Sequence, residues 1–561
     1  MKFPVKFLKI IFFSVLFFVC TALFSAPRGA QELVLSDSWI YDALTQVSLD
    51  AGIYNFTDDA PLTIQEITVY MNAIPYETLS AAGKKQYDRI KRYFAEQNIS
   101  FDSGVFSLGI DPAVTGEGYY KTNDSLDWIY DRYSRKPLID VPLTLSGKDF
   151  FTMMCDIELS ENQGVMSHDD NYTNIPAAAN EIDVNFPHTA YFSTGYKFAD
   201  ESGVSFQLGI FDKSIGRTQT GSIIWSDYFT GATYGQLSFY SPNFKYTGSV
   251  SQFDVDKYMY THLFQGRFFD KLTFSVMEGM LVYAPIELRY LNPFTIFHGM
   301  APWRDYGEDE SNTCAYMCFK LNYVPVKHVR IYGLFAQDQY QTPYELEHWP
   351  DSLTPNGLGG QLGIESYLPL QDGFFHVALE GYYADPYLYI KESPNWSLAR
   401  TYAENIGDMA VFYEWVGSPF GPDTISGELS LGYEKPGRWS ADLMYLYMCR
   451  GELSGTNTFD AVSDVWGGTD TDITDDEVNS DWAYPTTENG NSPFLTTPTG
   501  TPEYVNRLSV RVTWLPENWL SVIAQPGFVL IFNHNNTEGD TAYGFEFALS
   551  VNLSFHNGSA S

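Results

Sequence analysis

The chain has 561 residues and a formal net charge of −36, from 69 acidic and 33 basic side chains. This balance argues against nucleic acid as a partner, which needs clustered lysine and arginine, and against an acidic polysaccharide unless divalent cations bridge the two. Aromatic residues make up 17% of the chain, which is typical of membrane proteins with aromatic girdles at two interfaces; a soluble sandwich or carbohydrate enzyme is the alternative.

The N-terminus predicts a secretory signal peptide over residues 1–26, with cleavage between Ala22 and Ala30. Its basic residues and the apolar run that follows them are Lys2, Lys6, Lys9 and Ile10–Val19. No later segment has the ~18 apolar residues that a membrane-spanning helix needs. An exported chain without such helices can cross a bilayer only as a closed barrel, because open sheet edges leave backbone groups unsatisfied in lipid.

Residues 33–100 are predicted to form a small N-terminal α-helical region in the periplasm. Ser36 is expected to cap its first helix, and Thr63 with Glu66 forms a capping box before the second. The third helix is unusually basic and carries Lys84, Lys85, Arg89, Lys91 and Arg92. Two interpretations stay open for this cluster. It contacts an anionic partner (lipid headgroups, peptidoglycan or the barrel's own acidic rim), or it is a solvated helix face.

Residues 104–555 change to the period of a β-strand. Along Lys257–Phe268, Phe264 and Phe268 share one face, whereas Gln265 and Arg267 share the other. Apolar residues outside and charged residues inside are the pattern of a membrane barrel with a wet lumen. The sequence therefore predicts an all-β transmembrane β-barrel of about 18 antiparallel strands. A barrel of this size has room for a channel unless something fills it, and the helical region is one candidate filler or lid.

The last strand alternates almost perfectly, which predicts that it closes the barrel. Its apolar face carries Phe545, Phe547, Leu549, Val551, Leu553 and Phe555. A C-terminal strand ending in an aromatic residue resembles the signal that directs barrels to the assembly machinery of the bacterial outer membrane. Residues 556–561 follow as a short tail, which departs from that pattern. We therefore expect an integral outer-membrane protein with lipid and the barrel-assembly machinery as partners.

Residues 451–502 form the largest polar insertion and are predicted to be an acidic external loop. Its candidate metal ligands are Asp470, Asp472, Asp475, Asp476 and Asp481. Calcium prefers carboxylate oxygens, so a Ca²⁺ site is one interpretation. Counted from Asp470, however, an EF-hand would need glycine at Asp475 and glutamate at Asp481, so a hydrated acidic loop is the alternative. No other cofactor is expected.

Four cysteines of the mature chain are expected to be unpaired: Cys155, Cys314, Cys318 and Cys449. Residues four apart on one strand are separated by roughly 13 Å, which applies to Cys314 and Cys318. A disulfide needs Cα atoms within about 7 Å of each other.

Three short segments resemble the capsule-assembly Wzi-like outer-membrane proteins. In Gly209–Asp227 a strand precedes a glycine-rich turn, then Gly-Ser, two apolar residues and a serine. Glu287–Pro293 is similar to the family's Tyr-Leu-x-Pro region, and Arg330–Gln339 to a later strand, although Asp338–Gln339 stands where Asp-Glu is expected. The resemblance implies an approximately 18-stranded barrel, a helical periplasmic portion and a lectin-like role in retaining long polysaccharide on the cell.

Polar and aromatic residues in and near two of these segments are the candidate ligand-binding residues. Sugars are commonly held by aromatic faces together with polar groups. The candidates are Arg217, Trp225, Asp227, Arg289, Tyr290, His298 and Trp303. For each, packing in the barrel or in an aromatic girdle is the alternative. Gly216 and Gly221 are expected to form tight turns.

The chain lacks the Gly-x-Ser-x-Gly and His-Glu-x-x-His motifs of common hydrolases. His376 and Glu380 share a strand face but lie about 13 Å apart, too far for a base and its orienting group. We therefore expect no enzymatic activity.

The leading hypothesis is a barrel associated with surface polysaccharide. One alternative is a porin-type passive channel for cations or small neutral solutes, favoured by the acidic charge. Another is a surface adhesin that uses its long loops.

Overall fold

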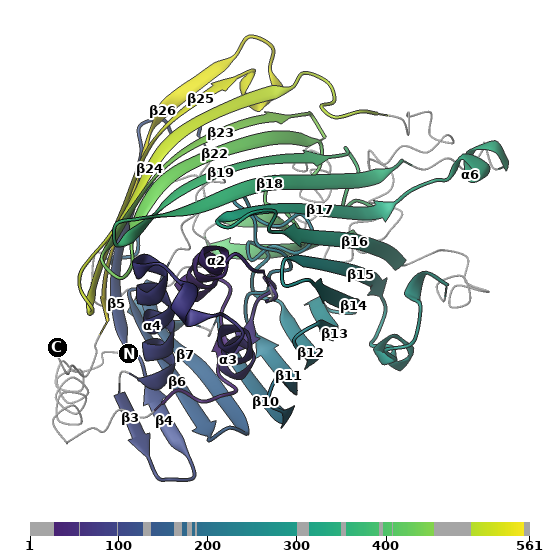
Figure 1. The fold of residues 1–561 in the computed structure, drawn as a ribbon. Coiled ribbons are helices and arrows are strands. Elements are labelled where there is room, and N and C mark those ends of the chain that lie inside the picture. Colours follow the sequence, from purple (N-terminus) through teal and green to yellow (C-terminus); the bar gives the residue numbers. More distant parts are fainter. Residues whose placement is uncertain are drawn as a thin grey trace, which may run out of the picture.

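The computed structural model describes residues 27–54, 56–97, 99–126, 136–161, 171–176, 182–185, 188–299, 313–348, 355–391, 397–406, 408–453 and 495–554. One antiparallel sheet curls on itself and closes into a barrel (Figure 1). Its wall has 18 strands, which confirms the predicted fold. Four further short strands pair with strands of the wall or with one another: β3 (Ile99–Asp102), β4 (Ser107–Ile110), β8 (Tyr172–Thr173) and β9 (Ile182–Asn185).

The strands of the wall follow one another around the barrel in chain order. They are β5 (Ala113–Lys121), β6 (Ile139–Gly147), β7 (Phe151–Glu161), β10 (Ala190–Ala199), β11 (Ser202–Ile210), β12 (Thr233–Tyr240), β13 (Phe244–Asp254), β14 (Lys257–Phe268), β15 (Leu272–Tyr283), β16 (Thr313–Tyr323), β17 (Val329–Gln339), β18 (Gly357–Leu370), β19 (Gly373–Ala384), β22 (Thr424–Lys435), β23 (Trp439–Arg450), β24 (Glu503–Glu517), β25 (Leu520–Phe532) and β26 (Thr541–Ser554). Strands β20 (Ala399–Ile406) and β21 (Asp408–Trp415) form a separate hairpin between β19 and β22.

The last strand closes the barrel, as predicted. β26 pairs with β5, from Glu546 opposite Lys121 to Ser554 opposite Ala113. Its apolar face points outward, because Phe545 is 63% exposed whereas Glu546 is 3% exposed. The predicted terminal aromatic Phe555 lies outside the described residues.

The wall has its apolar face outside and its polar face inside. On β14, Phe264 and Phe268 are exposed, whereas Gln265 and Arg267 are buried toward the lumen. The alternation in the sequence predicts that each strand has an apolar and a polar face, but not which face lies outside. In the closed barrel the apolar face lies outside, which is the arrangement of a membrane barrel.

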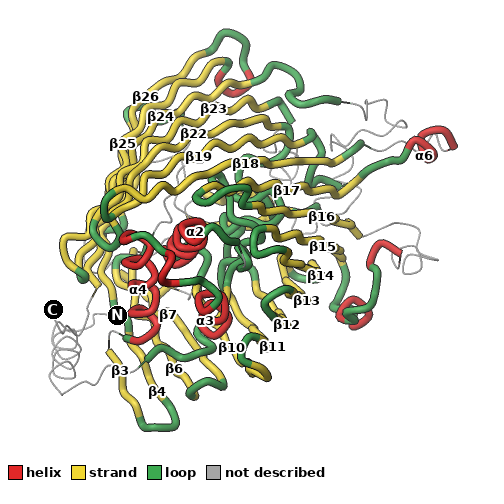
Figure 2. Tube along the Cα trace, in the orientation of Figure 1, coloured by secondary structure: helices red, strands yellow, loops and turns green. Residues whose placement is uncertain are grey.

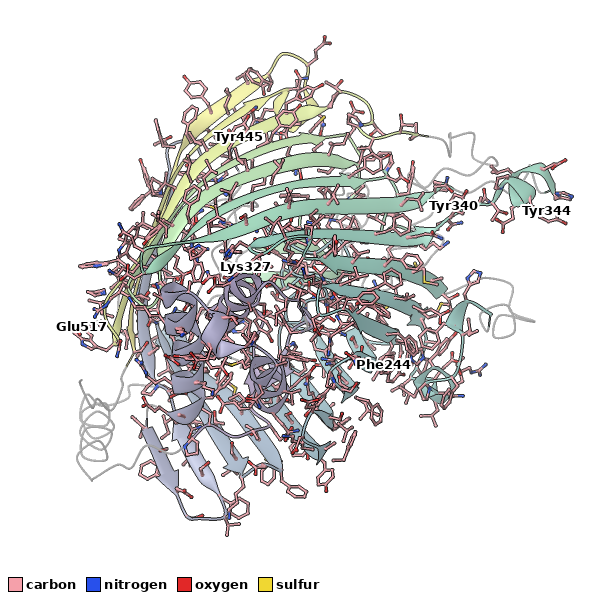
Figure 3. All side chains as sticks on the ribbon, in the orientation of Figure 1. Phe244, Lys327, Tyr340, Tyr344, Tyr445 and Glu517 are labelled. Atoms are coloured by element: carbon pink, nitrogen blue, oxygen red, sulfur yellow. The ribbon has the colours of Figure 1, made fainter. Side chains whose placement is uncertain are left out.

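The two ends of the barrel differ in the length of their connections. At one end, which we call the short-turn end, tight turns join the strands; Phe269 and Asp270, with φ of 57° and 55°, make the turn from β14 to β15. Long connections leave the other end, the long-loop end. Figure 3 shows Glu517 and Tyr344 at these opposite ends. In bacterial barrels short turns face the periplasm and long loops face outward.

Three helices cover the short-turn end (Figure 2). They are α2 (Trp39–Ala51), α3 (Ile64–Asn72) and α4 (Ala81–Ala95), with β1 (Leu33–Val34) paired to β2 (Leu62–Thr63) beside them. The smaller helical elements of the chain are η1 (Tyr76–Thr78), η2 (Leu288–Leu291), α6 (Pro343–His348) and η4 (His534–Asn536). Among the described residues, none of these helices has the length and apolar character to span a bilayer.

The helix caps confirm part of one prediction and correct another. Thr63 caps α3, its hydroxyl accepting from the Glu66 N–H at 3.1 Å. The Glu66 carboxylate instead accepts from Tyr70 and Lys245, so the reciprocal half of the predicted capping box is not formed. The prediction that Ser36 caps the first helix is wrong. Ser38 takes that place, because it lies directly before α2 and its hydroxyl accepts from the Ile40 N–H.

The basic face of α4 meets the acidic rim of the barrel. Lys85 lies 2.9 Å from Asp372, and Arg89 lies 3.8 Å from Glu434. Both carboxylates belong to the short-turn end, so these two cations contact the barrel itself, one of the interpretations left open above. None of these four cysteines forms a disulfide in the described part of the chain, as predicted.

Candidate functional site

The lumen contains a buried ionic cluster that joins the N-terminal region to the barrel wall. Asp58 and Asp59 lie on the segment between α2 and β2, and both accept from Lys320 of β16; the Asp58 contact is 2.5 Å. Arg330 of β17 donates to Asp58 at 3.1 Å and to Glu365 of β18 at 2.8 Å. The N-terminal segment therefore enters the barrel and is bound there by β16 and β17, and Glu365 of β18 completes the cluster through Arg330.

The ionic cluster is almost completely buried, so its charges depend on one another for compensation. The side chains of Asp58, Lys320 and Arg330 are each 1% exposed. Burial alone would raise the pKa of Asp58, but the neighbouring Lys320 and Arg330 charges outweigh it and lower that pKa to about 2. All three groups are thus held in their charged forms, and loss of any one leaves buried charge uncompensated.

A second segment enters the lumen from the long-loop end. Residues 211–232, which we call the inward loop, connect β11 to β12. Gly216 and Gly221 have φ of 88° and 95°, which confirms the predicted tight turns, since only glycine takes such values without strain. The inward loop packs its apolar side chains into one buried cluster with lumenal residues of the wall: Ile215, Ile223, Ile224, Trp225 and Phe229.

The two inserted segments meet inside the barrel. Ala60 and Ser214 exchange both backbone hydrogen bonds, at 2.9 and 3.0 Å. The Gly216 N–H donates to Asp59 at 3.0 Å, and the Arg217 N–H donates to Asp58 at 3.2 Å. The same carboxylates therefore bind the wall and the inward loop, so the N-terminal segment, the loop and the barrel form one connected structure across the lumen.

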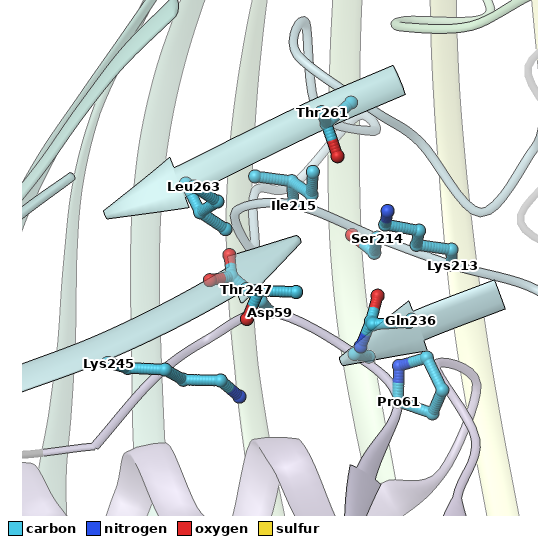
Figure 4. A pocket seen from close by; sticks show the side chains of 11 residues that line it. Asp59, Pro61, Lys213, Ser214, Ile215, Gln236, Lys245, Thr247, Thr261 and Leu263 are labelled. Carbon is cyan, nitrogen blue, oxygen red and sulfur yellow. The ribbon is translucent and has the colours of Figure 1, made fainter. Parts of the chain in front are cut away.

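A small cavity remains beside this junction (Figure 4). Two buried lysines line it with threonine and glutamine side chains. Lys245 pairs with Glu66 at 2.7 Å. Lys213 donates to Ser249 at 2.9 Å and lies 4.6 Å from the centre of the Trp225 ring. Burial lowers the pKa of Lys213 to about 7, because it removes the ammonium from water.

Three predicted ligand-binding residues belong to the inward loop. Trp225 has no exposed surface, whereas a ring that stacks on a sugar from solution needs an open face. Arg217 pairs with Asp42 of α2 at 2.5 Å. Asp227 is half-buried, and burial raises its pKa against the opposing charge of Arg217. All three are parts of the lumenal closure here; their role in binding stays a prediction.

The other candidates lie elsewhere. Tyr290 is buried against the outside of the wall, where its ring stacks on Tyr260 at 4.9 Å. Arg289 pairs with Glu287 at 2.9 Å. His298 is exposed, and Trp303 lies outside the described residues. The structure thus does not bring the six described candidates together in one site.

The metal prediction lies on residues outside the described part of the chain. Asp470, Asp472, Asp475, Asp476 and Asp481 all fall in the undescribed part of the 451–502 loop. In the ranges that the structure describes, no three histidine, cysteine, aspartate or glutamate side chains gather to hold a metal ion.

The ionic cluster itself was not identified from the sequence. Its members are Asp58, Asp59, Lys320, Arg330 and Glu365. The sequence did contain a signal for the position of Lys320. Its neighbours Phe319 and Leu321 are apolar and face outward, and successive side chains on a strand alternate, so Lys320 faces the lumen. What the sequence could not supply is its partner, some 260 residues earlier in the chain.

Known proteins were compared with this chain by sequence and by structure. No protein-family model matches the chain, and no curated protein matches it by sequence. Among solved structures, Wzi of Escherichia coli is similar over 93% of this chain and 99% of its own, with a TM-score of 0.55 and 12% identity. It is described as an outer membrane protein involved in group 1 capsule assembly and as a carbohydrate-binding β-barrel.

Two other outer-membrane proteins share less of the structure. OprD of Pseudomonas aeruginosa covers 80% of this chain and 93% of its own, with a TM-score of 0.36 and 8% identity. OmpT of Vibrio cholerae covers 81% and 99%, with a TM-score of 0.31 and 8% identity. The likeness to Wzi shows the fold, an outer-membrane barrel of Wzi-like architecture.

Proposed function

We propose that this chain is a closed, non-catalytic outer-membrane barrel that binds surface polysaccharide and retains it at the cell. The observation that carries this proposal is the meeting of two inserted segments inside the lumen, where Ala60 pairs with Ser214. A porin needs a continuous water-filled path, whereas here a buried ionic cluster and an apolar cluster lie across it. The closure therefore favours an anchor over a passive channel.

The likeness to Wzi supports the choice of ligand. Wzi is described as a carbohydrate-binding barrel, and this chain shares its fold over nearly its whole length. The acidic charge of the present chain limits which polysaccharides it can bind directly. A neutral polysaccharide meets no repulsion, whereas an acidic one requires divalent cations between the two surfaces.

Exposed aromatic residues at the long-loop end supply a surface for sugar rings. Tyr340 and Tyr344 are 48% and 60% exposed, and α6 carries Tyr344 away from the barrel (Figure 3). The Tyr344 ring stacks on His348 with centroids 3.9 Å apart. A reciprocal cap between Thr342 and Glu345 fixes the start of α6. The two tyrosines are thus presented outward on a locally ordered element.

The test is binding of purified surface polysaccharide to the protein in lipid nanodiscs, with and without Ca²⁺. We expect the wild-type protein to bind. The double variant Tyr340→Ala, Tyr344→Ala should bind roughly tenfold more weakly, at about 0.5–1.5 kcal/mol per lost aromatic contact. The control, Tyr445→Ala, removes an exposed tyrosine from the outer wall and should leave binding unchanged. No binding by the wild-type protein under either condition contradicts the proposal.

A further inference from the structure

The connection that leaves β15 folds back over the outside of the barrel. We call residues 284–299 the outer flap; it contains η2 and packs against β13, β14 and β15. Two of its aromatic side chains are buried against the wall. Tyr290 is 1% exposed and stacks on Tyr260, and Phe297 is 0% exposed with its ring 4.3 Å from that of His262. The flap is therefore a packed part of the fold.

Beneath the outer flap, the wall presents polar side chains on its outward face. His262 and Glu278 are direct cross-strand partners on β14 and β15. They share the face of Phe264, which is 44% exposed to the outside. His262 Nδ1 lies 2.7 Å from the Tyr246 hydroxyl, and Glu278 accepts from the His298 N–H at 2.9 Å. The flap thus supplies a backbone partner to an outward carboxylate.

The height of this pair places it at the level of lipid. His262 lies six residues from Phe268 at the short-turn end of β14. Six residues rise about 20 Å along a strand, or roughly 15 Å along the axis of a barrel whose strands tilt by about 40°. The apolar band of an outer-membrane barrel is about 25 Å tall. A histidine and a glutamate facing outward at this height are costly unless something separates them from the acyl chains.

The outward surface of the flap is apolar. Its exposed apolar side chains, from 45% to 91% exposed, are Ile286, Leu288, Leu291, Phe294 and Ile296. Glu287 and Arg289 are its fully charged residues at neutral pH, and they neutralise each other at 2.9 Å. Asn292 and His298 are its exposed uncharged polar side chains. This surface continues the apolar outer face of the adjoining strands, where Phe264 and Phe274 are exposed.

We propose that the outer flap lies in the outer leaflet of the membrane, where its exposed side chains contact lipid acyl chains. In this position it separates the His262–Glu278 pair from hydrocarbon. Three observations carry the proposal: the depth of the pair on the lipid-facing wall, the hydrogen bond and ring packing that hold the flap over it, and the apolar, charge-neutral surface that the flap turns outward. The flap is thus a lipid-contacting element in addition to the strands of the barrel.

The test places a fluorophore on the flap and quenches it from within the bilayer. Phe294→Cys is labelled with an environment-sensitive dye in a Cys155→Ser background, because Cys155 is exposed whereas the other three cysteines are buried. The protein is refolded into phosphatidylcholine vesicles that contain phospholipids with a nitroxide on the acyl chain. Phe264→Cys is the matched control on the lipid-facing wall, and Tyr344→Cys is the control on α6 in water. Heat-modifiable gel mobility verifies that each variant is folded.

We expect dye at position 294 to lose most of its emission to the acyl-chain nitroxide, as at position 264, while dye at position 344 stays unquenched. Emission at position 294 that matches position 344 overturns the proposal, because the flap would then lie in water. The proposal is also overturned if the dye at position 294 is unquenched and the residue crosslinks to a second copy of the chain. That result would show that the flap forms a protein interface. Neither result bears on polysaccharide binding, which is measured separately.

Discussion

At the scale of the residue, Asp58 connects the N-terminal segment to both the barrel wall and the inward loop. Its two carboxylate oxygens contact Lys320, Arg330 and the backbone of Arg217, so one side chain joins two strands and the inward loop. Buried ion pairs contribute little net stability compared with a well-packed apolar core, but breaking one is expensive. We interpret the cluster as a fixed attachment of the N-terminal segment inside the lumen.

Replacing Lys320 tests that attachment. Lys320→Met leaves Asp58 and Asp59 without one of their buried cations, and we expect the free energy of unfolding to fall by about 3–5 kcal/mol. Urea unfolding in lipid vesicles, followed by tryptophan fluorescence, measures it. The matched control is Lys327→Met, because Lys327 is exposed in the turn after β16. Equal stability of the two variants would contradict a structural role for the cluster.

Acidification tests the same group without relying on Lys320. The pKa of Asp58 is lowered to about 2, so its contribution is present above its ordinary pKa of about 3.9 and is lost as the pH falls through about 2. The contribution is about 2–3 kcal/mol near neutral pH. The stability difference between wild type and Asp58→Asn should therefore shrink by this amount between pH 6 and pH 2. A difference that is independent of pH would show that Asp58 is not charged in the folded protein.

At the scale of the element, the sequence predicts what is periodic and fails where contacts are distant. Alternation along β14 and β26 predicts strands with one lipid-facing side, and the structure confirms both. The inward loop is different, because its glycines predict turns but nothing in its composition says that it folds into the lumen. Likewise, the sequence predicts Tyr290 as an aromatic-girdle or sugar-binding residue, but it does not predict that Tyr290 belongs to the outer flap and packs against the wall.

The closing strand gives a prediction about assembly. Phe555 ends the apolar face of the β26 pattern, and an aromatic residue at this place resembles the signal for the barrel-assembly machinery. We expect Phe555→Ala to slow insertion into the outer membrane without changing the final structure. Pulse-chase labelling with heat-modifiable mobility measures the rate, with Phe545→Ala on the same strand face as the comparison. Normal insertion of Phe555→Ala would contradict the assignment of the signal.

At the scale of the whole molecule, one segment from each end of the barrel enters the lumen, and the two segments meet there. The 18 strands pair with one another in a complete ring, so the wall does not depend on the N-terminal helices for its hydrogen bonds. The number of strands and the helical region could be predicted from periodicity. The meeting of two segments inside the lumen could not be predicted, because it depends on the contacts of Asp58 with Lys320 and of Ala60 with Ser214, which are distant in the sequence.

The current through single molecules in planar lipid bilayers tests this closure most directly. We expect the wild-type protein to show no large, stable conductance, because the N-terminal segment and the inward loop cross the lumen. Deletion of residues 33–97 should leave a folded barrel with a larger current, since it removes one of the two segments. Large, stable conductance steps from the intact wild-type protein would contradict the account, because they require an open water path where the structure places the junction of Ala60 and Ser214.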